Sequence, residues 1–252
     1  QERSLGLGAM GWHSLLHQKR IAFESHEARE LNWDVFRTIK EQASQESIQL
    51  GLERGEAPDM QGTGRRNAHL LAIAPNANSS IIVSTSPSIE PMKANAYTHR
   101  TRAGSHLVKN VYLEQELKKA KKNTQDVWSD IITNGGSVQH LDFLSDKVKD
   151  VFKTAIELDQ NSLVEQAADR QEFLCQGQSL NLFFPAGADK KQLHDAHFAA
   201  WKLGTKGLYY LRTETSQRAE NVSQKVARDA LKDYESQTME AQSQDECVAC
   251  QG

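Results

Sequence analysis

A short run, His69–Ala74, constrains the fold most, because it is apolar in five of its six positions and stops at a proline. Such a run predicts a buried strand. Pro75 ends it because proline has no amide hydrogen to donate to a neighbouring strand. Asn76–Ser80 then places capping side chains before Ile81 and Ile82, which predicts the start of a helix. We therefore expect a strand, a tight turn and a helix in direct succession.

The residues of this turn are a candidate anion site. The first amides of a helix lack partners within the helix, and the helix dipole favours a negative charge beside them. The candidates are Asn76, Ala77, Asn78, Ser79 and Ser80. An ordinary helix cap without a ligand explains the same residues, and the pattern leaves both alternatives open.

Other segments predict scaffold. Ser25 is placed to cap a long helix with apolar residues every four positions, which Gly55 ends. Further helices are expected at 124–132, 145–156 and 161–173, and strands at 97–101 and 107–111 around Gly104. Gly207–Arg212 is a strand candidate that contains the adjacent tyrosines Tyr209 and Tyr210. Simple packing explains a Tyr pair in a strand, since tyrosine is a good strand residue.

Composition excludes some classes of partner. The net charge is −3 over 252 residues, so there is no basic field for nucleic acid or an anionic membrane surface. No apolar stretch approaches the roughly 18 residues of a membrane span, and no signal pattern is seen at the N-terminus. We expect a cytoplasmic protein whose chain, beginning at Gln1 without an initiator Met, starts within a domain.

The last forty residues differ from the rest. Residues 213–252 carry four basic and eight acidic side chains and little to bury, so a flexible, solvated tail is expected. Cys247 and Cys250 form a C-x-x-C near its end. Zinc needs four ligands, and no further Cys or His accompanies this pair. A mobile dithiol that exchanges with a disulfide elsewhere is the remaining interpretation.

Two other sites are assigned no chemistry. Cys175 follows Phe173 and Leu174, where a free cysteine is expected to pack. His194 and His197 lie three apart on a predicted helix but lack a nearby third ligand, so no metal site is expected.

Several motifs in a fixed order carry a resemblance to a known family. They are Arg66–Asn67, Ser86–Pro91, Gln176–Leu182, Leu193–Lys206 and the Tyr pair that follows. Together they resemble the C-terminal portion of the class I ribonucleotide reductase large subunit. The resemblance implies an α/β fold, the C-terminal part of a ten-stranded α/β barrel over residues 1–213, with a flexible tail over 214–252.

The resemblance also implies roles for the candidate residues. Tyr209 and Tyr210 would relay a radical from a separate small subunit, which holds the radical or metal cofactor. The turn at 76–80 would hold the phosphates of a ribonucleoside diphosphate, although Asn76 and Asn78 stand where the family often has Ser or Thr. Cys247 and Cys250 would re-reduce the active site and be reset by thioredoxin or glutaredoxin. The family often has an acidic residue where this chain has Cys175.

The family's radical cysteine, and the cysteines that reduce the ribose, lie upstream of the part that this chain resembles. We therefore expect a chain that is inactive alone and works with a separate N-terminal part of the large subunit. No cofactor is expected in the chain itself. The alternative is a non-catalytic fragment that binds the small subunit or another chain.

Overall fold

The computed structural model describes residues 1–101 and 104–213. The described chain forms two compact units. The first contains residues 1–92 and 155–213, and the second contains residues 93–154. Cys247 and Cys250, like the whole predicted tail, lie outside the described residues, so the proposed division at residue 213 stays a prediction.

Four extended segments form a parallel row in the first unit, which we call the wall. In spatial order, the wall segments are residues 5–7, 69–73, 176–184 and 209–213. Single parallel bridges join Leu7 to Leu71 and Ile73 to Gln178. A regular parallel ladder joins β3 (Leu182–Phe184) to β4 (Leu211–Thr213). The strand expected at 69–74 thus lies in the wall, bonded on both sides, but only as isolated bridges.

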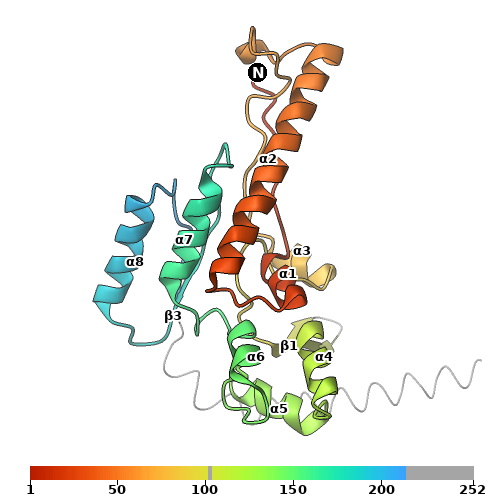
Figure 1. The fold of residues 1–252 in the computed structure, drawn as a ribbon, viewed down its shortest axis with the longest axis vertical. Coiled ribbons are helices and arrows are strands. Elements are labelled where there is room, and N and C mark those ends of the chain that lie inside the picture. Colours follow the sequence, from red (N-terminus) through yellow and green to blue (C-terminus); the bar gives the residue numbers. More distant parts are fainter. Residues whose placement is uncertain (102–103, 214–252) are drawn as a thin grey trace, which may run out of the picture. The chain divides into compact units, whose positions relative to one another are not determined.

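Three helices connect the wall segments in sequence. They are α2 (His26–Arg54), α7 (Gln160–Gln171) and α8 (Lys190–Lys202). Helix α7 packs against both α2 and α8, and Figure 1 shows it between them. A row of parallel segments joined by helices is one part of an α/β barrel wall. Within the described residues the row is not closed into a barrel.

Helix α2 begins and ends where the sequence predicts. The Ser25 hydroxyl accepts a hydrogen bond from the Ala28 amide at 3.1 Å, and Gly55 at its end has a φ of 80°. Arg29, in its first turn, makes a two-bonded ion pair with Asp169 of α7, at 2.8 and 2.9 Å. The pKa of Arg29 is raised, chiefly by this bond to Asp169. The pair fixes one helix against the other.

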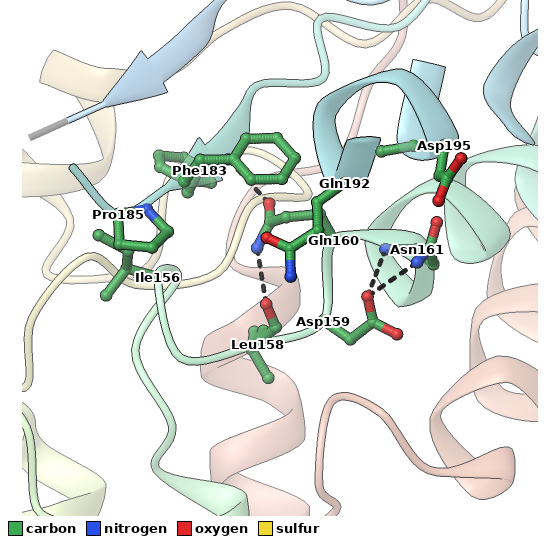
Figure 2. A pocket seen from close by; sticks show the side chains of 11 residues that line it. Ile156, Leu158, Asp159, Gln160, Asn161, Phe183, Pro185, Gln192 and Asp195 are labelled. Carbon is green, nitrogen blue, oxygen red and sulfur yellow. Dashed lines mark hydrogen bonds between the residues drawn. The ribbon is translucent and has the colours of Figure 1, made fainter. Parts of the chain in front are cut away.

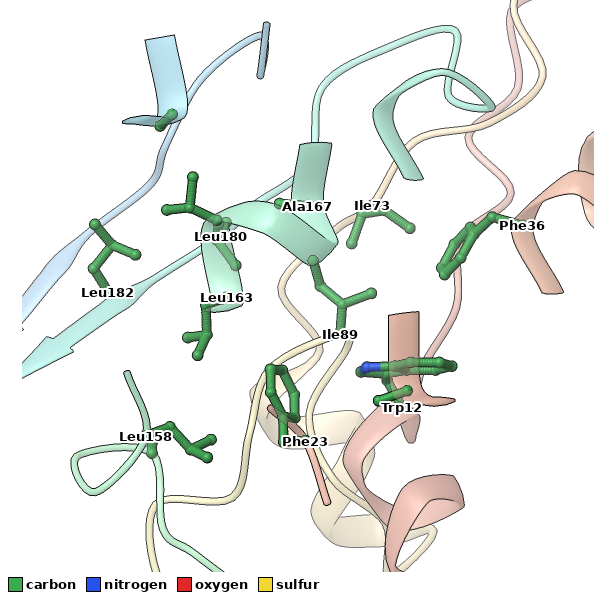
Figure 3. Packing of buried hydrophobic residues seen from close by; sticks show 14 of the residues in the cluster. Trp12, Phe23, Phe36, Ile73, Ile89, Leu158, Leu163, Ala167, Leu180 and Leu182 are labelled. Carbon is green, nitrogen blue, oxygen red and sulfur yellow. The ribbon is translucent and has the colours of Figure 1, made fainter. Parts of the chain in front are cut away.

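The other elements of the first unit are short. They are α1 (Trp12–Lys19), a 3₁₀ turn at Pro58–Met60 and α3 (Ala77–Ile82). Apolar residues from the wall, α1 and α7 meet in one core, which includes Trp12, Phe23, Ile89, Leu163 and Leu180 (Figure 3). The wall is therefore covered by the core on its α7 side.

A buried arginine lies within this apolar core. Arg170 of α7 is 1% exposed, and its Nε donates to the Asn32 Oδ1 at 2.8 Å. Its two terminal nitrogens reach the side-chain oxygens of Gln178 and Gln166, each at 3.4 Å. Burial lowers the pKa of Arg170 to about 9. The guanidinium still keeps its charge at neutral pH, and neutral amides from α2, α7 and the wall solvate it.

The second unit is a hairpin with three helices. Strands β1 (Ala96–Thr101) and β2 (Gly104–Lys109) pair in an antiparallel ladder. The helices are α4 (Val111–Lys119), α5 (Gln125–Thr133) and α6 (Asp146–Val151). The Asn95 side-chain amide donates to the carbonyls of Gly136 and Phe152, which ties the hairpin to the segments after α5 and α6.

Several of the predicted elements have different bounds in the structure. The helix expected over 145–156 ends at Val151, and the Ala155 amide donates instead to the Met92 carbonyl at 2.8 Å. The strand expected over 207–212 begins only at Leu211. The strand expected over 107–111 spans Gly104–Lys109 instead, so Gly104, which was expected in a turn, belongs to the strand, and Val111 already begins α4. In each case a long-range backbone bond or pairing partner decides the boundary.

We expect Arg170→Ala to lower the free energy of unfolding by about 3 kcal/mol or more, because it leaves buried amide oxygens unpaired and opens a cavity. Urea denaturation of the 252-residue chain measures the loss. Lys202→Ala, at an exposed position of α8, is the control and should change the stability little. Equal stability of Arg170→Ala and the wild type would show that the amide network does not need the cation.

Candidate functional site

The two adjacent tyrosines form a contact pair at the end of the wall. The ring centroids of Tyr209 and Tyr210 are 4.1 Å apart, with the planes inclined by 53°. Both side chains are about half exposed, at 49% and 51%. Consecutive residues of a regular strand point to opposite faces, so such a contact requires a departure from the pleat.

The backbone shows where the departure occurs. Tyr209 donates its amide to the Leu180 carbonyl at 2.8 Å, and the Tyr210 carbonyl accepts from the Leu182 amide at 3.0 Å. Between these two bonds, the Tyr210 amide donates to the side-chain Oδ1 of Asn181 at 3.0 Å, not to a backbone carbonyl. The ladder is therefore interrupted at the tyrosines and resumes at Leu211.

The Tyr210 phenol acts on the Tyr209 phenol. The pKa of Tyr209 is raised, first by a hydrogen bond with Tyr210 and then by the charge of that neighbour. The Arg212 guanidinium lies 4.8 Å from the centre of the Tyr210 ring. Two phenols in such contact can exchange a proton, since each is both a donor and an acceptor. The two rings are in contact, and the relay role itself stays a prediction.

The candidate phosphate turn follows a wall segment, as expected. The first intrahelical bond of α3 runs from the Ser80 amide to the Asn76 carbonyl at 3.0 Å, so the amides of residues 77–79 precede the helical ladder. Asn76 makes no capping bond with its side chain. Ser80 is buried, and its hydroxyl donates to the Ala77 carbonyl. An anion at this turn would thus contact Asn76, Ala77, Asn78 and Ser79 more readily than the buried Ser80.

A separate pocket of about 250 Å³ lies between the start of α7, the start of α8 and the end of β3 (Figure 2). Phe183 and Pro185 line one part of it, and Asp159, Asn161 and Asp195 another. Asp159 accepts from the amide and side chain of Asn161, and Asp195 accepts from Lys191. None of the sequence-predicted site residues lines this pocket.

Cys175 has a role that the sequence did not indicate. Its sulfur accepts hydrogen bonds from the amides of Leu70 and Leu71 at 3.2 and 3.3 Å, and the Lys40 Nζ lies 3.8 Å away. Partial burial raises the thiol pKa, but the two amides and the lysine lower it by more, so the net pKa is lowered. The sulfur thus takes the place of a carbonyl between two wall segments.

Residues 1–101 and 104–213 hold neither a metal cluster nor a membrane-spanning helix. No group of three or more His, Cys, Asp or Glu side chains there is arranged to hold a metal ion. No helix in that part is long and apolar enough to cross a membrane.

The wall with its helices and the tyrosine pair define a portion of an α/β barrel protein. The model of the family "Ribonucleotide reductase, barrel domain" matches residues 1–64 and 58–211. The chain therefore belongs to this family, and it is part of the barrel domain of a ribonucleotide reductase large subunit.

Individual relatives agree with this membership. A Frog virus 3 (isolate Goorha) protein named a ribonucleoside-diphosphate reductase large subunit is 52% identical over 251 residues, covering 100% of this chain and 42% of that protein. The large subunit of Invertebrate iridescent virus 6 is 47% identical, covering 88% of this chain and 24% of that protein.

A solved structure shares the fold. The Actinobacillus ureae class Id ribonucleotide reductase alpha subunit matches with a TM-score of 0.80 and 39% identity. The match covers 88% of this chain and 41% of that one. The chain thus spans less than half the length of each of these three relatives.

We expect Cys175 to react with iodoacetamide with a midpoint below that of a free thiol. Measuring the alkylation rate against pH in a Cys247→Ser/Cys250→Ser background isolates this thiol. Lys40→Met removes one charge that favours the thiolate, so it should shift the midpoint upward. A midpoint at or above that of a free thiol in both proteins would contradict the assignment.

The lowered pKa of the Cys175 thiol has a consequence for stability. Because the folded pKa lies below the unfolded one, the thiolate contributes stability that is fully present above the unfolded pKa. That stability is lost as the pH falls through the folded pKa.

Proposed function

We propose that this chain is the C-terminal part of a class I ribonucleoside-diphosphate reductase large subunit. It would reduce ribonucleoside diphosphates to deoxyribonucleotides for DNA synthesis, together with a separate N-terminal part of the large subunit. The contact between Tyr209 and Tyr210, in a chain of this family, carries the proposal. A pair built only for packing has no need to leave the strand pleat and remain half exposed.

The open wall supports the need for a second part. Among the described residues, the segments at 5–7 and 209–213 lie at the two edges of the row. An exposed strand edge presents unpaired amides and carbonyls, which further strands satisfy. Additional strands, up to the ten of the predicted barrel, would close the wall and bring the radical cysteine.

Each candidate residue has a role in this proposal. Tyr209 and Tyr210 pass a radical from the small subunit, which holds the metal or radical cofactor, toward that cysteine. Residues 76–80 hold the substrate phosphates by their amides. Cys247 and Cys250 reduce the active-site disulfide and are reset by thioredoxin or glutaredoxin.

A second function is favoured by one observation. Helix α8 exposes Phe198 and Trp201, at 50% and 73%, with ring centroids 5.4 Å apart. Exposed aromatic pairs are frequent in protein interfaces. A fragment that only binds the small subunit or another chain would use such a face without any turnover.

Co-expression distinguishes the two functions. We expect ribonucleoside diphosphate reduction when the chain is combined with the N-terminal part of the Frog virus 3 relative, a small subunit and thioredoxin, and none with the chain alone. Tyr210→Phe should keep the fold and abolish turnover, because the phenol O–H is lost while nearly all the apolar area stays. Turnover by the isolated chain, or unchanged turnover in Tyr210→Phe, contradicts the proposal. Assembly without turnover in the wild type favours the binding function.

Truncation after Gln244 tests the dithiol in the same reconstituted enzyme. From Arg212 to Cys247 there are 35 residues. A coil of that length spans roughly 30 to 35 Å, which is long enough for the dithiol to move between the active site and an external reductant. We expect substrate binding and one turnover to remain, and multiple turnover with thioredoxin to be lost. A small dithiol should restore part of the rate, whereas normal turnover with thioredoxin would exclude the pair as the shuttle.

A further inference from the structure

We propose that Glu90 and Asn181 are positioning residues that hold the Tyr209–Tyr210 pair in contact. The proposal concerns the geometry of the pair, and its meaning for radical transfer rests on the proposed function. Neither residue was a candidate from the sequence. Both lie in motifs, Ser86–Pro91 and Gln176–Leu182, whose role the function proposed above leaves unexplained.

The two side chains form a buried bond beneath the tyrosines. Glu90 is 5% exposed and Asn181 is 6% exposed. Both the side-chain Nδ2 and the backbone amide of Asn181 donate to the Glu90 Oε1, at 2.5 and 3.2 Å. On its other side, the Asn181 Oδ1 accepts the Tyr210 amide. One side chain thus connects a buried carboxylate to the backbone of the pair.

The carboxylate sets which way the Asn181 amide points. The Glu90 Oε1 accepts both Asn181 donors, so the Nδ2 faces Glu90. The Oδ1 then faces the opposite direction, toward the Tyr210 amide. Without Glu90, the Asn181 side chain could rotate and present its donor to the Tyr210 amide, which is itself a donor. The carboxylate therefore acts through Asn181 on the tyrosine backbone.

This bond explains why the pleat is interrupted at the tyrosines. In a regular parallel ladder only every second residue bonds to a given neighbour. Because the Tyr209 amide bonds to the Leu180 carbonyl, the Tyr210 amide would then point away from the segment at 176–184, and the two rings would alternate between faces. The Asn181 oxygen takes that amide instead, between the two backbone bonds made by Tyr209 and Tyr210. The contact between the rings is thus a consequence of the side-chain bond.

Glu90 is held by its own segment. Its amide donates to the Pro87 carbonyl at 3.0 Å, and Pro91 follows it. The same segment is fixed to the start of α1, because the Ser86 and Ser88 carbonyls accept the amides of Gly11 and Trp12. The carboxylate is therefore a rigid reference point against which the tyrosine backbone is placed.

The test measures the contact directly, without reductase activity. Fluorotyrosine at position 209 of the 252-residue chain lets ¹⁹F NMR follow the titration of that phenol. The measured quantity is the difference in the pKa of residue 209 between the Tyr210 form and the Tyr210→Phe form. This difference isolates the contact, because a charge introduced at position 90 or 181 acts on both forms and cancels.

We expect a clear positive difference in the wild type and its loss in Asn181→Leu, which has no acceptor for the Tyr210 amide. Asn181→Asp should also lose it, because the introduced carboxylate is repelled by Glu90. The exchanged pair Glu90→Gln/Asn181→Asp should recover the difference. In that pair the amide introduced at position 90 donates to the carboxylate introduced at position 181, which still accepts from the Tyr210 amide. Circular dichroism checks that each variant is folded.

A difference that persists in Asn181→Asp, or that the exchanged pair fails to recover, overturns the proposal. If Asn181→Leu does not fold, the other two variants still decide. In the reconstituted enzyme, kcat should fall in Asn181→Asp and recover in the exchanged pair, with KM unchanged. If the NMR results are as expected but the reconstituted wild-type enzyme shows no turnover, the positioning role is supported and the proposed function is refuted. The failure of one proposal can therefore be told apart from the failure of the other.

Discussion

The buried charge of Arg170 is the constraint on which the packing of the first unit depends. A guanidinium removed from water is costly unless its donors are met, so the chain must bring oxygens to it from several directions. Asn32 comes from α2, Gln166 from α7 and Gln178 from the wall. One charge therefore fixes two helices and a wall segment at a single point, which apolar contacts alone specify less sharply.

The tyrosine pair depends on the same wall. The segment at 176–184 pairs with one neighbour at Gln178 and with another at Leu182, so it bridges the arginine network and the tyrosines. Between these positions Asn181 directs its side chain to Tyr210. The short motif Gln176–Leu182 contains both Gln178 and Asn181. It thus contacts the buried arginine through Gln178 and the tyrosine pair through Asn181.

Cys175 illustrates how a local substitution can keep a structural role. The sequence indicates only a packed thiol beside Phe173 and Leu174. In the structure its sulfur accepts two amides of the neighbouring wall segment, with Lys40 nearby. An acceptor is needed there because buried amides are rarely left unpaired. The acidic residue that the family often has at this position would meet the same need.

The sequence by itself determined the family and the local elements, because caps such as Ser25, the stop at Pro75 and the motif order are encoded within a few residues. It also located the tyrosines. Only the tertiary structure decided that their rings meet, since the Asn181 bond to Tyr210 joins positions 29 residues apart and Glu90 lies 91 residues from Asn181. Spacing along a chain carries no information on such distant bonds, and a regular strand would place the two rings on opposite faces.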